Sequence, residues 1–425
     1  MSSVISALLG GVYIPKMARV RQRFPRPQIK PEAIPETIFQ LLEEDKFSEK
    51  IQPGMSVCIT AGSRGIANIA LITRTLVEYC IKRGAKPFIV PAMGSHGGAL
   101  AEGQREILAA LGITEETMGC PIRATMETVK VGETEEGHSV RIDKYAAAAD
   151  AIIVSCRIKP HTGFRGPYES GIMKMMAIGL GKQEGAEACH GVGAKHMARM
   201  VPMFGRVIRD NAPVAFALAT IENAYDETAK LIALTPDEFD EMEPVYLKEA
   251  FANMPRLLFD SCDLLIVDWI GKNISGDGMD PNVTGAFGTP YASGGIDAKR
   301  ICALRLTEES HHSAVGMGLA DAISKKLWEQ VDLDVTYPNA ITSTVLEPVK
   351  IPPIMENDRL AIQLCLHTAN EMDRNAPRII RISNTLSLEH IMVSEAMLEE
   401  AKRHSDITIE GVPEELQFDE EGNLL

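Results

Sequence analysis

Residues 159–174 read Lys159-Pro160-His161-Thr162-Gly163-Phe164-Arg165-Gly166-Pro167-Tyr168-Glu169-Ser170-Gly171-Ile172-Met173-Lys174. They follow an apolar run, residues 149–156, whose continuous hydrophobicity is typical of a buried parallel strand. Ligands of open α/β sheets bind beyond the carboxyl ends of the strands. Histidine and lysine side chains that come directly after such a strand therefore indicate a functional site.

Two strand–turn–helix units precede this segment, and both carry polar groups in their turns. The first is predicted with a strand at 56–60 and a helix at 66–83, and the second with a strand at 87–92 and a helix at 101–111. The first turn, Ala61-Gly62-Ser63-Arg64-Gly65, places an arginine beside a helix N-terminus. The second turn, Gly94-Ser95-His96-Gly97-Gly98, places a histidine between glycines. We expect both turns at the same edge of one sheet.

Length and composition indicate a globular α/β protein with more than one core. The chain has 425 residues, 45% of them hydrophobic and 24% charged, and strands alternate with helices along it. We predict two α/β domains with parallel or mixed, Rossmann-like sheets and an interdomain cleft. The first spans residues 1–253. The second spans residues 254–425 and closes the cleft, with its last segment packing back on the first.

Hydrophobic period and turn residues predict the remaining elements. The predicted helices lie at 35–46, 195–209, after Thr235, at 319–330 and at 389–403; the predicted strands lie at 214–221, 230–234, 263–268, 362–366 and 379–382. A hairpin is expected at 129–142 and a long glycine-rich loop at 271–295. The acidic tail from Glu410 is expected to be loosely held.

Charge and cysteine usage narrow the class of partner. A net charge of −15 argues against nucleic acid or an anionic membrane as a partner. The eight cysteines are scattered in apolar contexts without a CxxC pair, as reduced core cysteines are. No apolar run is long enough to span a bilayer, and the first residues lack the features of a signal peptide. We therefore expect a cytoplasmic protein with a small-molecule substrate, and a homo-oligomer is possible in principle.

Each candidate residue has a chemical reason and an ordinary alternative. Arg64 could bind a carboxylate in a fork, or be a solvated turn residue. His96 and His161 titrate near neutrality, although a loop histidine is more often merely solvated. Lys174 and Lys182 lie in an apolar, glycine-interrupted segment that would make an amine nucleophilic, but Lys174 could instead extend from a helix to water. His190 suits a metal or a satisfied core position.

Taken in order, these motifs resemble the nickel-dependent lactate racemase superfamily. That family has a Thr-Arg turn, a Gly-Thr-His turn, a histidine followed by a Gly-Tyr-Ser-Gly-Gly-Ala-Lys block, and a further histidine. The chain has Ser63-Arg64, Ser95-His96, His161 with Gly163 and Ser170-Gly171-Ile172-Met173-Lys174, and then His190. The resemblance covers roughly the first half of the chain, and five motifs in the same order are hard to obtain by chance.

The resemblance implies a cofactor and a role for each residue. The cofactor would be a nickel-pincer nucleotide, pyridinium-3,5-bisthiocarboxylic acid mononucleotide nickel, supplied by cofactor-synthesis enzymes. Lys174 would hold it covalently, His190 would be the protein's nickel ligand, and Ser63, Gly163 and Gly171 would line its site. His96 and His161 would be the two general bases, and Arg64 would orient the substrate carboxylate. The implied reaction inverts an α-hydroxy acid by proton and hydride relay.

The chain departs from the family in three places. Ala61 stands where the family has an aspartate before the turn arginine, and the block between His161 and Lys174 is longer than usual. In the second half, Thr284, Gly285 and Gly288 stand where the family has an aromatic, an amide and a lysine. These small residues suggest a larger or differently polar substrate than lactate, with Lys272 as a contact from the second domain.

The leading interpretation is a racemase or epimerase of α-hydroxy acids. One alternative is a zinc-dependent hydrolase or lyase with His96, His161 and His190 as ligands, because imidazoles also bind zinc. Another is a non-catalytic protein that binds a nucleotide cofactor. Metal analysis separates nickel bound with sulfur from zinc bound with water.

Overall fold

The computed structural model describes residues 3–63 and 65–425 and divides the chain into two compact units. One unit comprises residues 26–254, and the other joins residues 1–25 to residues 255–425. The predicted boundary after residue 253 is within one residue of the second crossing point. The prediction was wrong for the first residues, because strand β1 (Met17–Gln22) pairs with strands of the second unit.

The 26–254 unit is built on a five-stranded sheet with strand order β3-β2-β6-β7-β8. Four strands run parallel, and β8 is antiparallel to β7. Their bounds are β2 Ser56–Ala61, β3 Lys86–Pro91, β6 Ala151–Arg157, β7 Val214–Glu222 and β8 Thr228–Leu234. Strand β6 is almost entirely buried, as its uninterrupted apolar sequence predicts for a central parallel strand. The five predicted strands are confirmed.

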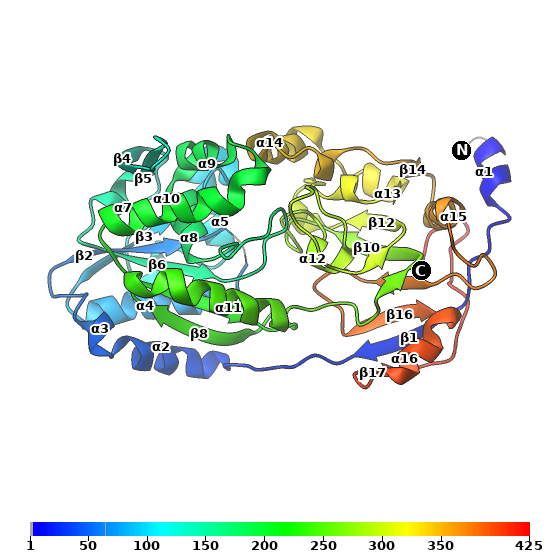
Figure 1. Cartoon of the computed structure of the whole chain (residues 1–425), viewed down its shortest axis with the longest axis horizontal. Coiled ribbons are helices and arrows are strands. Elements are labelled where there is room, and N and C mark those ends of the chain that lie inside the picture. Colours follow the sequence, from blue (N-terminus) through cyan, green and yellow to red (C-terminus); the bar gives the residue numbers. More distant parts are fainter. Residues whose placement is uncertain (1–2, 64) are drawn as a thin grey trace. The chain divides into compact units, whose positions relative to one another are not determined.

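Helices cover both faces of this sheet (Figure 1). One face packs on α2 (Ile34–Leu42) and α4 (Ile69–Lys82), and the other on α10 (Met197–Asn211) and α11 (Phe239–Asn253). The predicted hairpin is confirmed as β4 (Thr128–Glu133) and β5 (Ser139–Asp143). The other α-helices described in this unit are α3 Asp45–Ser48, α5 Ala101–Ala110, α6 Glu115–Met118, α7 Lys144–Ala147, α8 Ile172–Lys174 and α9 Lys182–His190.

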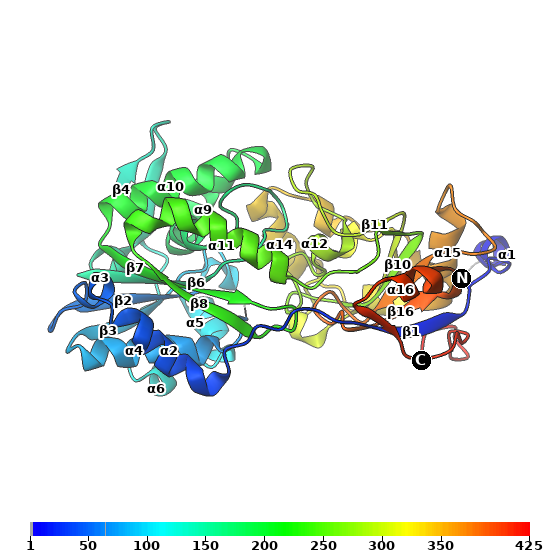
Figure 2. The same cartoon turned by 60° about the horizontal axis from the view of Figure 1, so that its bottom comes forward.

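The second unit contains an eight-stranded mixed sheet of order β14-β13-β12-β10-β15-β16-β1-β17. The first five strands in this order are parallel, and the last three are joined by antiparallel pairs (Figure 2). The bounds are β10 Leu264–Ile270, β12 Ile301–Leu306, β13 Ala322–Ser324, β14 Ile354–Met355, β15 Ile379–Ile382, β16 His390–Ser394 and β17 Ile407–Ile409. A separate pair joins β9 (Ser261–Cys262) to β11 (Asp297–Ala298). Two mixed, mostly parallel sheets confirm the predicted α/β class.

Three predicted elements of this unit were wrong. Residues 362–366 belong to helix α15 (Asp358–Thr368), the predicted helix at 319–330 is β13 followed by α13 (Lys325–Trp328), and the predicted helix at 389–403 begins as β16 before α16 (Leu398–Arg403). Short apolar runs have no period that separates a strand from a buried helix. The other helices of the unit are α1 Ser3–Leu9, α12 Pro281–Thr284 and α14 Leu333–Ser343.

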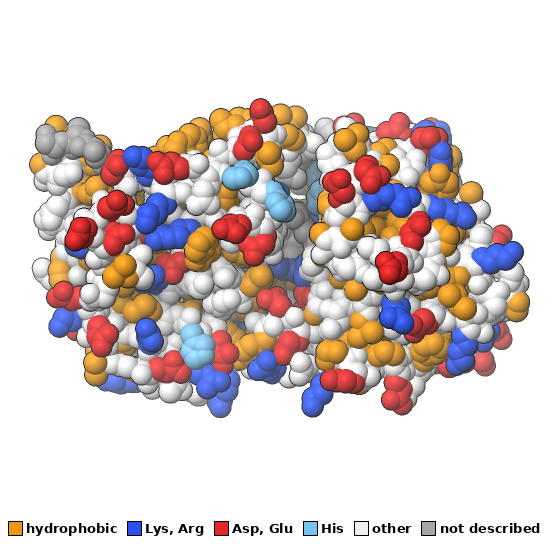
Figure 3. Space-filling model, turned by 180° about the vertical axis from the view of Figure 1, so that it is seen from behind, with side chains coloured by type: hydrophobic (Ala, Val, Ile, Leu, Met, Phe, Trp, Pro, Cys, Tyr) orange, Lys and Arg blue, Asp and Glu red, His pale blue; other side chains and the backbone are white. Residues whose placement is uncertain are grey.

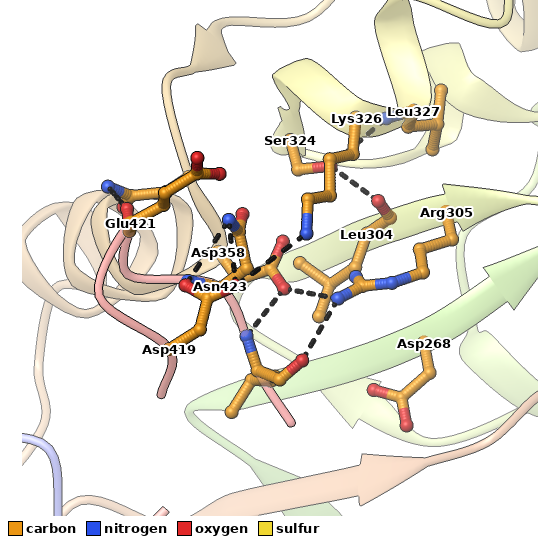
Figure 4. A network of polar contacts seen from close by, with 12 residues as sticks. Asp268, Leu304, Arg305, Ser324, Lys326, Leu327, Asp358, Asp419, Glu421 and Asn423 are labelled. Carbon is orange, nitrogen blue, oxygen red and sulfur yellow. Dashed lines mark hydrogen bonds and ion pairs between the residues drawn. The ribbon is translucent and has the colours of Figure 1, made fainter. Parts of the chain in front are cut away.

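The end of the chain is fixed to this unit, contrary to the expected loose tail (Figure 4). The backbone N–H of Leu424 donates to Asp358 Oδ2 at 2.9 Å, and Arg305 donates to the same oxygen at 2.7 Å and to the Leu424 carbonyl at 3.2 Å. Asn423 is buried and donates to Asp419. These contacts place the last segment on α15 and β12 of its own unit.

Charged side chains lie on the surface, and the thiols lie in the interior. Acidic and basic side chains are interspersed on the face in Figure 3. All eight cysteines are buried with free thiols, as predicted. In the described ranges, 3–63 and 65–425, no helix combines the length and the apolar character that crossing a membrane requires.

Candidate functional site

Three segments follow neighbouring strands of the five-stranded sheet at its carboxyl edge. The turn with Ser63 follows β2, the turn with His96 follows β3, and the loop with His161 follows β6. Strand β2 lies between β3 and β6, so all three segments emerge side by side. The fold therefore assembles the predicted motifs at the edge where α/β sheets bind ligands. Arg64, predicted to bind a carboxylate, lies outside the described residues.

The first two turns are joined by a hydrogen bond between side chains. Ser63 Oγ lies 2.5 Å from His96 Nδ1. The serine hydroxyl can donate to this nitrogen or accept from it, so it can serve either ring tautomer. Ser63 therefore holds the His96 ring through Nδ1. Ser63, predicted as a cofactor contact, thus also orients the predicted base.

The loop after β6 folds around a buried carboxylate. Glu169 is 2% exposed and accepts the backbone N–H of His161 at 2.7 Å and that of Gly166 at 3.2 Å. Arg165 donates to the same carboxylate and to the His161 carbonyl. Burial raises the pKa of Glu169, while these donors oppose the shift. The buried Glu169 carboxylate therefore holds the backbone of the loop that carries His161.

The His161 ring has its own contacts within the loop. Gly163 N–H donates to His161 Nδ1 at 2.9 Å, and the ring packs against Phe164 with centroids 4.4 Å apart. A neutral ring that accepts at Nδ1 carries its proton on Nε2. In this arrangement His161 therefore presents an N–H donor, whereas His96 can present either form. Gly163, predicted to line the cofactor site, selects the tautomer of His161.

Lys174 and His190 lie at the two ends of an unusual helical segment. Helix α8 ends at Lys174, a π-helical stretch covers Met175–Leu180, and α9 ends at His190. Helical segments with π geometry are rare in proteins, and those that occur are often found at functional sites. Burial, followed by the nearby positive charge of Lys174, lowers the pKa of His190 to about 4, so its ring is neutral at physiological pH. A neutral imidazole beside an amine is a donor set that suits a metal-bearing cofactor.

The π-helical stretch packs directly against the first two turns. Gly94 N–H donates to the Gly179 carbonyl at 3.2 Å. A Cβ atom at Gly179 would lie 2.7 Å from the carbonyl oxygen of Ala92, and one at Gly62 would lie 3.3 Å from the end of Met175. These close approaches bring the His96 turn to the segment that carries Lys174.

The two lysines that the sequence could not separate have different environments. Lys174 is half-buried beside His190, whereas Lys182 is fully buried and its ammonium lies 3.1 Å from Asp143 Oδ2. Lys182 also donates to Gln104 Oε1 at 3.1 Å and to the Pro91 carbonyl. Burial lowers its pKa and the paired carboxylate opposes that shift. With its ammonium engaged in the core, Lys182 is unsuited to hold a cofactor.

Gly171, predicted to contact the cofactor, has a packing reason to be glycine. A Cβ atom there would lie 2.1 Å from Glu243 Oε1. Glu243 is 1% exposed, and its Oε2 accepts the backbone N–H of Met173 at 3.1 Å, at the start of the helix that ends in Lys174. Burial raises the pKa of Glu243 to about 8. A buried, largely protonated acid therefore supports α8.

In the other unit, the glycine-rich loop is fixed by its own side chains. The Lys272 ammonium donates to the Gly276 carbonyl and to Asn339 Oδ1, each at 3.0 Å. A Cβ atom at Gly285 would lie 2.2 Å from the Ile296 carbonyl, and one at Gly288 would lie 2.9 Å from Pro348. The space that these small residues were expected to open is filled by the chain itself. The predicted substrate contact of Lys272 stays a prediction.

The three histidines proposed as zinc ligands do not form a cluster. Within residues 3–63 and 65–425, no group of three or more His, Cys, Asp or Glu side chains is placed to hold a metal ion. A zinc site made of His96, His161 and His190 therefore has no support in this arrangement.

Sequence reasoning missed the buried polar residues beneath the site. These are Gln104, Asp143, Glu169 and Glu243. Only Asp143 had a local signal, because an acid directly before a short helix is a typical N-cap, and it accepts from the N–H groups of Tyr145 and Ala146. The other three are single polar residues that the pattern leaves undistinguished from surface positions.

Comparison with known proteins agrees with the resemblance to the lactate racemase family. Residues 15–200 match the sequence family described as the lactate racemase N-terminal domain. A solved structure of the lactate racemase apoprotein from Thermoanaerobacterium thermosaccharolyticum is 14% identical and aligns over 87% of this chain and 94% of its own, with a TM-score of 0.51. A Thermotoga maritima protein is 13% identical over 86% of this chain and 99% of its own, also with a TM-score of 0.51. At these identities the structures show the shared fold. No curated protein sequence matches significantly.

Proposed function

Because residues 15–200 belong to the lactate racemase N-terminal domain family, we propose that the chain is a racemase or epimerase of an α-hydroxy acid. The observation that carries the proposal is the convergence of the Ser63–His96 pair and the Lys174-to-His190 segment at one sheet edge. Such a reaction needs a positioned proton acceptor, which the Ser63–His96 pair would supply. It also needs a site for the group that takes the α-hydrogen, which the Lys174-to-His190 segment would supply.

The residues fit a nickel-pincer nucleotide. His190 offers one neutral imidazole, and the described chain supplies no cluster of three ligands, so the remaining donors must come from the cofactor. Lys174 would hold the cofactor and His190 would ligate its nickel. When bound, such a cofactor supplies an electrophilic pyridinium ring that can take up and return a hydride.

The chain's own residues would bind the substrate and transfer its hydroxyl proton. His96 Nε2 would accept the proton of the substrate hydroxyl, while Ser63 keeps the ring in place from Nδ1. His161, on the neighbouring loop, would serve the opposite face through Nε2. For His161 to act as the base, its proton must move to Nδ1 and the Gly163 bond must open. Arg64 is proposed to bind the carboxylate.

Metal analysis and intact-mass measurement of protein made together with the cofactor-synthesis enzymes test the cofactor. Nickel in about equal amount to protein, with a covalent mass increase, is expected. A panel of α-hydroxy acids, each assayed for inversion at the α-carbon, then tests the activity. Nickel and adduct without inversion of any substrate would favour a cofactor-binding protein, and zinc without an adduct would contradict the proposal.

The two histidines provide the matched test of mechanism. His96→Ala and His161→Ala should each lower the rate by roughly 10²–10⁴-fold, the usual contribution of a positioned acid–base group. Both variants should keep nickel and adduct. His196→Ala, a half-buried histidine in the turn before α10, serves as the control. Near-full turnover in both directions by either variant would contradict the two-base mechanism.

A further inference from the structure

A buried polar network lies beneath the His96 turn and is not part of the proposed chemistry. Its members are Lys182, Asp143 and Gln104, each with 0% exposure. Lys182 forms an ion pair with Asp143, its ammonium 3.1 Å from Oδ2, and donates a hydrogen bond to Gln104 Oε1 at 3.1 Å. Buried polar groups specify one arrangement of the surrounding chain when every member has a partner.

Gln104 carries this network to the turn that holds His96. Its Nε2 donates to the Gly94 carbonyl at 2.9 Å and to the His96 carbonyl at 3.2 Å. Lys182 adds a bond to the Pro91 carbonyl, at the end of β3 where the turn begins. Gly94, Gly97 and Gly98 of this turn all have positive φ angles, which glycine adopts more readily than other residues.

Lys182 also belongs to the segment that joins Lys174 to His190. It is the first residue of α9 and has a φ of +55°, a left-handed conformation that is unfavourable for a lysine. An ammonium without exposure and a strained backbone are both costly, and a hydrophobic residue would avoid the first cost. The network therefore links the proposed base, His96, to the segment proposed to hold the cofactor. It does so through Lys182, where a buried ammonium and a left-handed backbone are both unfavourable.

We propose that Lys182 is a positioning residue: through Gln104 it fixes the His96 turn relative to the segment between Lys174 and His190. This inference rests on the proposed function, because it gives His96 the role of base. A base displaced by about 1 Å can lose on the order of 10²-fold in rate while the binding of substrate changes little. The network would thus affect kcat more than KM.

Removing Lys182 alone would leave Asp143 buried without a partner and could prevent folding. The informative variant is therefore Lys182→Met/Asp143→Asn, which removes both charges and keeps an oxygen to cap Tyr145 and Ala146. Gln104→Met is the second variant, because it removes the contacts to Gly94 and His96 and leaves the ion pair. The matched control is Arg305→Met/Asp358→Asn, which removes a buried ion pair in the other unit.

Two measurements decide the inference. In apoprotein labelled with ¹³C-histidine, the His96 ring signal should shift or broaden in both network variants and stay unchanged in the control. In loaded enzyme, both should lower kcat by roughly 10- to 100-fold with KM nearly constant. In the His96→Ala background, Gln104→Met should cost nothing further, because the two act through one group.

The outcomes separate the two claims. An unchanged His96 signal in both folded variants, or full additivity with His96→Ala, would overturn the positioning role. Full activity of His96→Ala itself would instead contradict the proposed base, and the ring signal would still report whether the network fixes the turn.

Discussion

At the scale of single residues, the structure distinguishes two lysines of one apolar segment. Lys174 is half-buried next to His190, while the ammonium of Lys182 is engaged by Asp143 and Gln104. We therefore predict that peptide mapping of loaded protein finds the cofactor adduct on Lys174. Lys174→Ala should abolish the adduct while Lys182→Met/Asp143→Asn retains it. An adduct on Lys182 would show that the buried ion pair opens during loading.

Glu243 predicts a pH dependence of stability. Its pKa is about 8 in the folded protein against an ordinary value of 4.5. Between these values the unfolded chain ionises Glu243 and the folded chain does not, so stability falls as pH rises from 4.5 to 8. The loss amounts to at most ~1.4 kcal/mol per pH unit. Below 4.5 both states are protonated and the effect disappears.

Glu243→Gln should remove this slope, because the amide oxygen can still accept the Met173 N–H and cannot ionise. We expect a higher midpoint of thermal denaturation than wild type at pH 8 and an equal midpoint near pH 4.5. Glu241→Gln, at an exposed position of the same helix, should leave the profile unchanged. An equal shift of Glu243→Gln at both pH values would indicate altered packing in place of titration.

Candidate site residues that lie in sequence motifs could be located from the sequence. The buried residues that contact the backbone around them could not. The turn with His96 and the loop with His161 follow β3 and β6 at the predicted sheet edge, whereas the roles assigned to His96, His161, Lys174 and His190 stay predictions. Gln104 lies on α5, eight residues after His96, and Glu243 lies on α11, seventy residues after Met173; both contact backbone groups, and no local pattern encodes these contacts. For the same reason, the expectation that Gly285 and Gly288 open space for a substrate is wrong.

At the scale of elements, prediction succeeded where strands are long and separated by clear turns. Strands β2, β3, β6 and β7 were recovered within two residues at most of their ends, because each apolar run is bounded by glycine, proline or charge. Residues 362–366 lie in helix α15 and not in the predicted strand; the local signal for this helix is its N-cap Asn357, whose side chain accepts from Leu360 N–H at 2.9 Å. Residues 390–394 form a strand because β1 is available to pair with them.

The contacts of the last residues lead to a prediction about the stability of helix α15. Deleting residues 420–425 removes the backbone donor and acceptor that Leu424 gives to Asp358 and Arg305. It also removes the Gly422 carbonyl that accepts from Arg359 N–H at 3.0 Å. Hydrogen bonds to charged groups contribute about 1.5–3 kcal/mol each. We expect faster hydrogen exchange over the first turn of α15, while Val412→Ala, at an exposed tail position, should have no effect. Unchanged exchange would mean that the tail contacts are not maintained in solution.

At the scale of the whole molecule, the chain crosses between its two units twice, near residues 25 and 254. The second crossing was predicted, because composition changes there. The first was missed, because residues 17–22 contain only a short alternating pattern that gives no information on its partner. Strand pairing between residues hundreds of positions apart is decided by the sheet edge that is available, which a local pattern cannot show.

The discontinuous unit gives a final prediction. Strand β1 lies between β16 and β17, with Val20 opposite Ile391 on one side and Ile409 on the other. Val20 is fully buried. Val20→Pro removes a ladder donor and places a ring in the interior of the sheet, where proline is not tolerated. Hydrogen exchange should therefore rise in peptides covering β16 and β17, although both strands lie hundreds of residues after β1 in the sequence.

Arg21→Ala, at a half-exposed side chain of the same strand, is the matched control and should leave both peptides protected. Peptides across β12, several strands away in the sheet, report whether the disturbance stays local. Protection of β17 equal to wild type in Val20→Pro would show that β17 does not depend on β1, and that residues 1–25 are not an integral part of this unit.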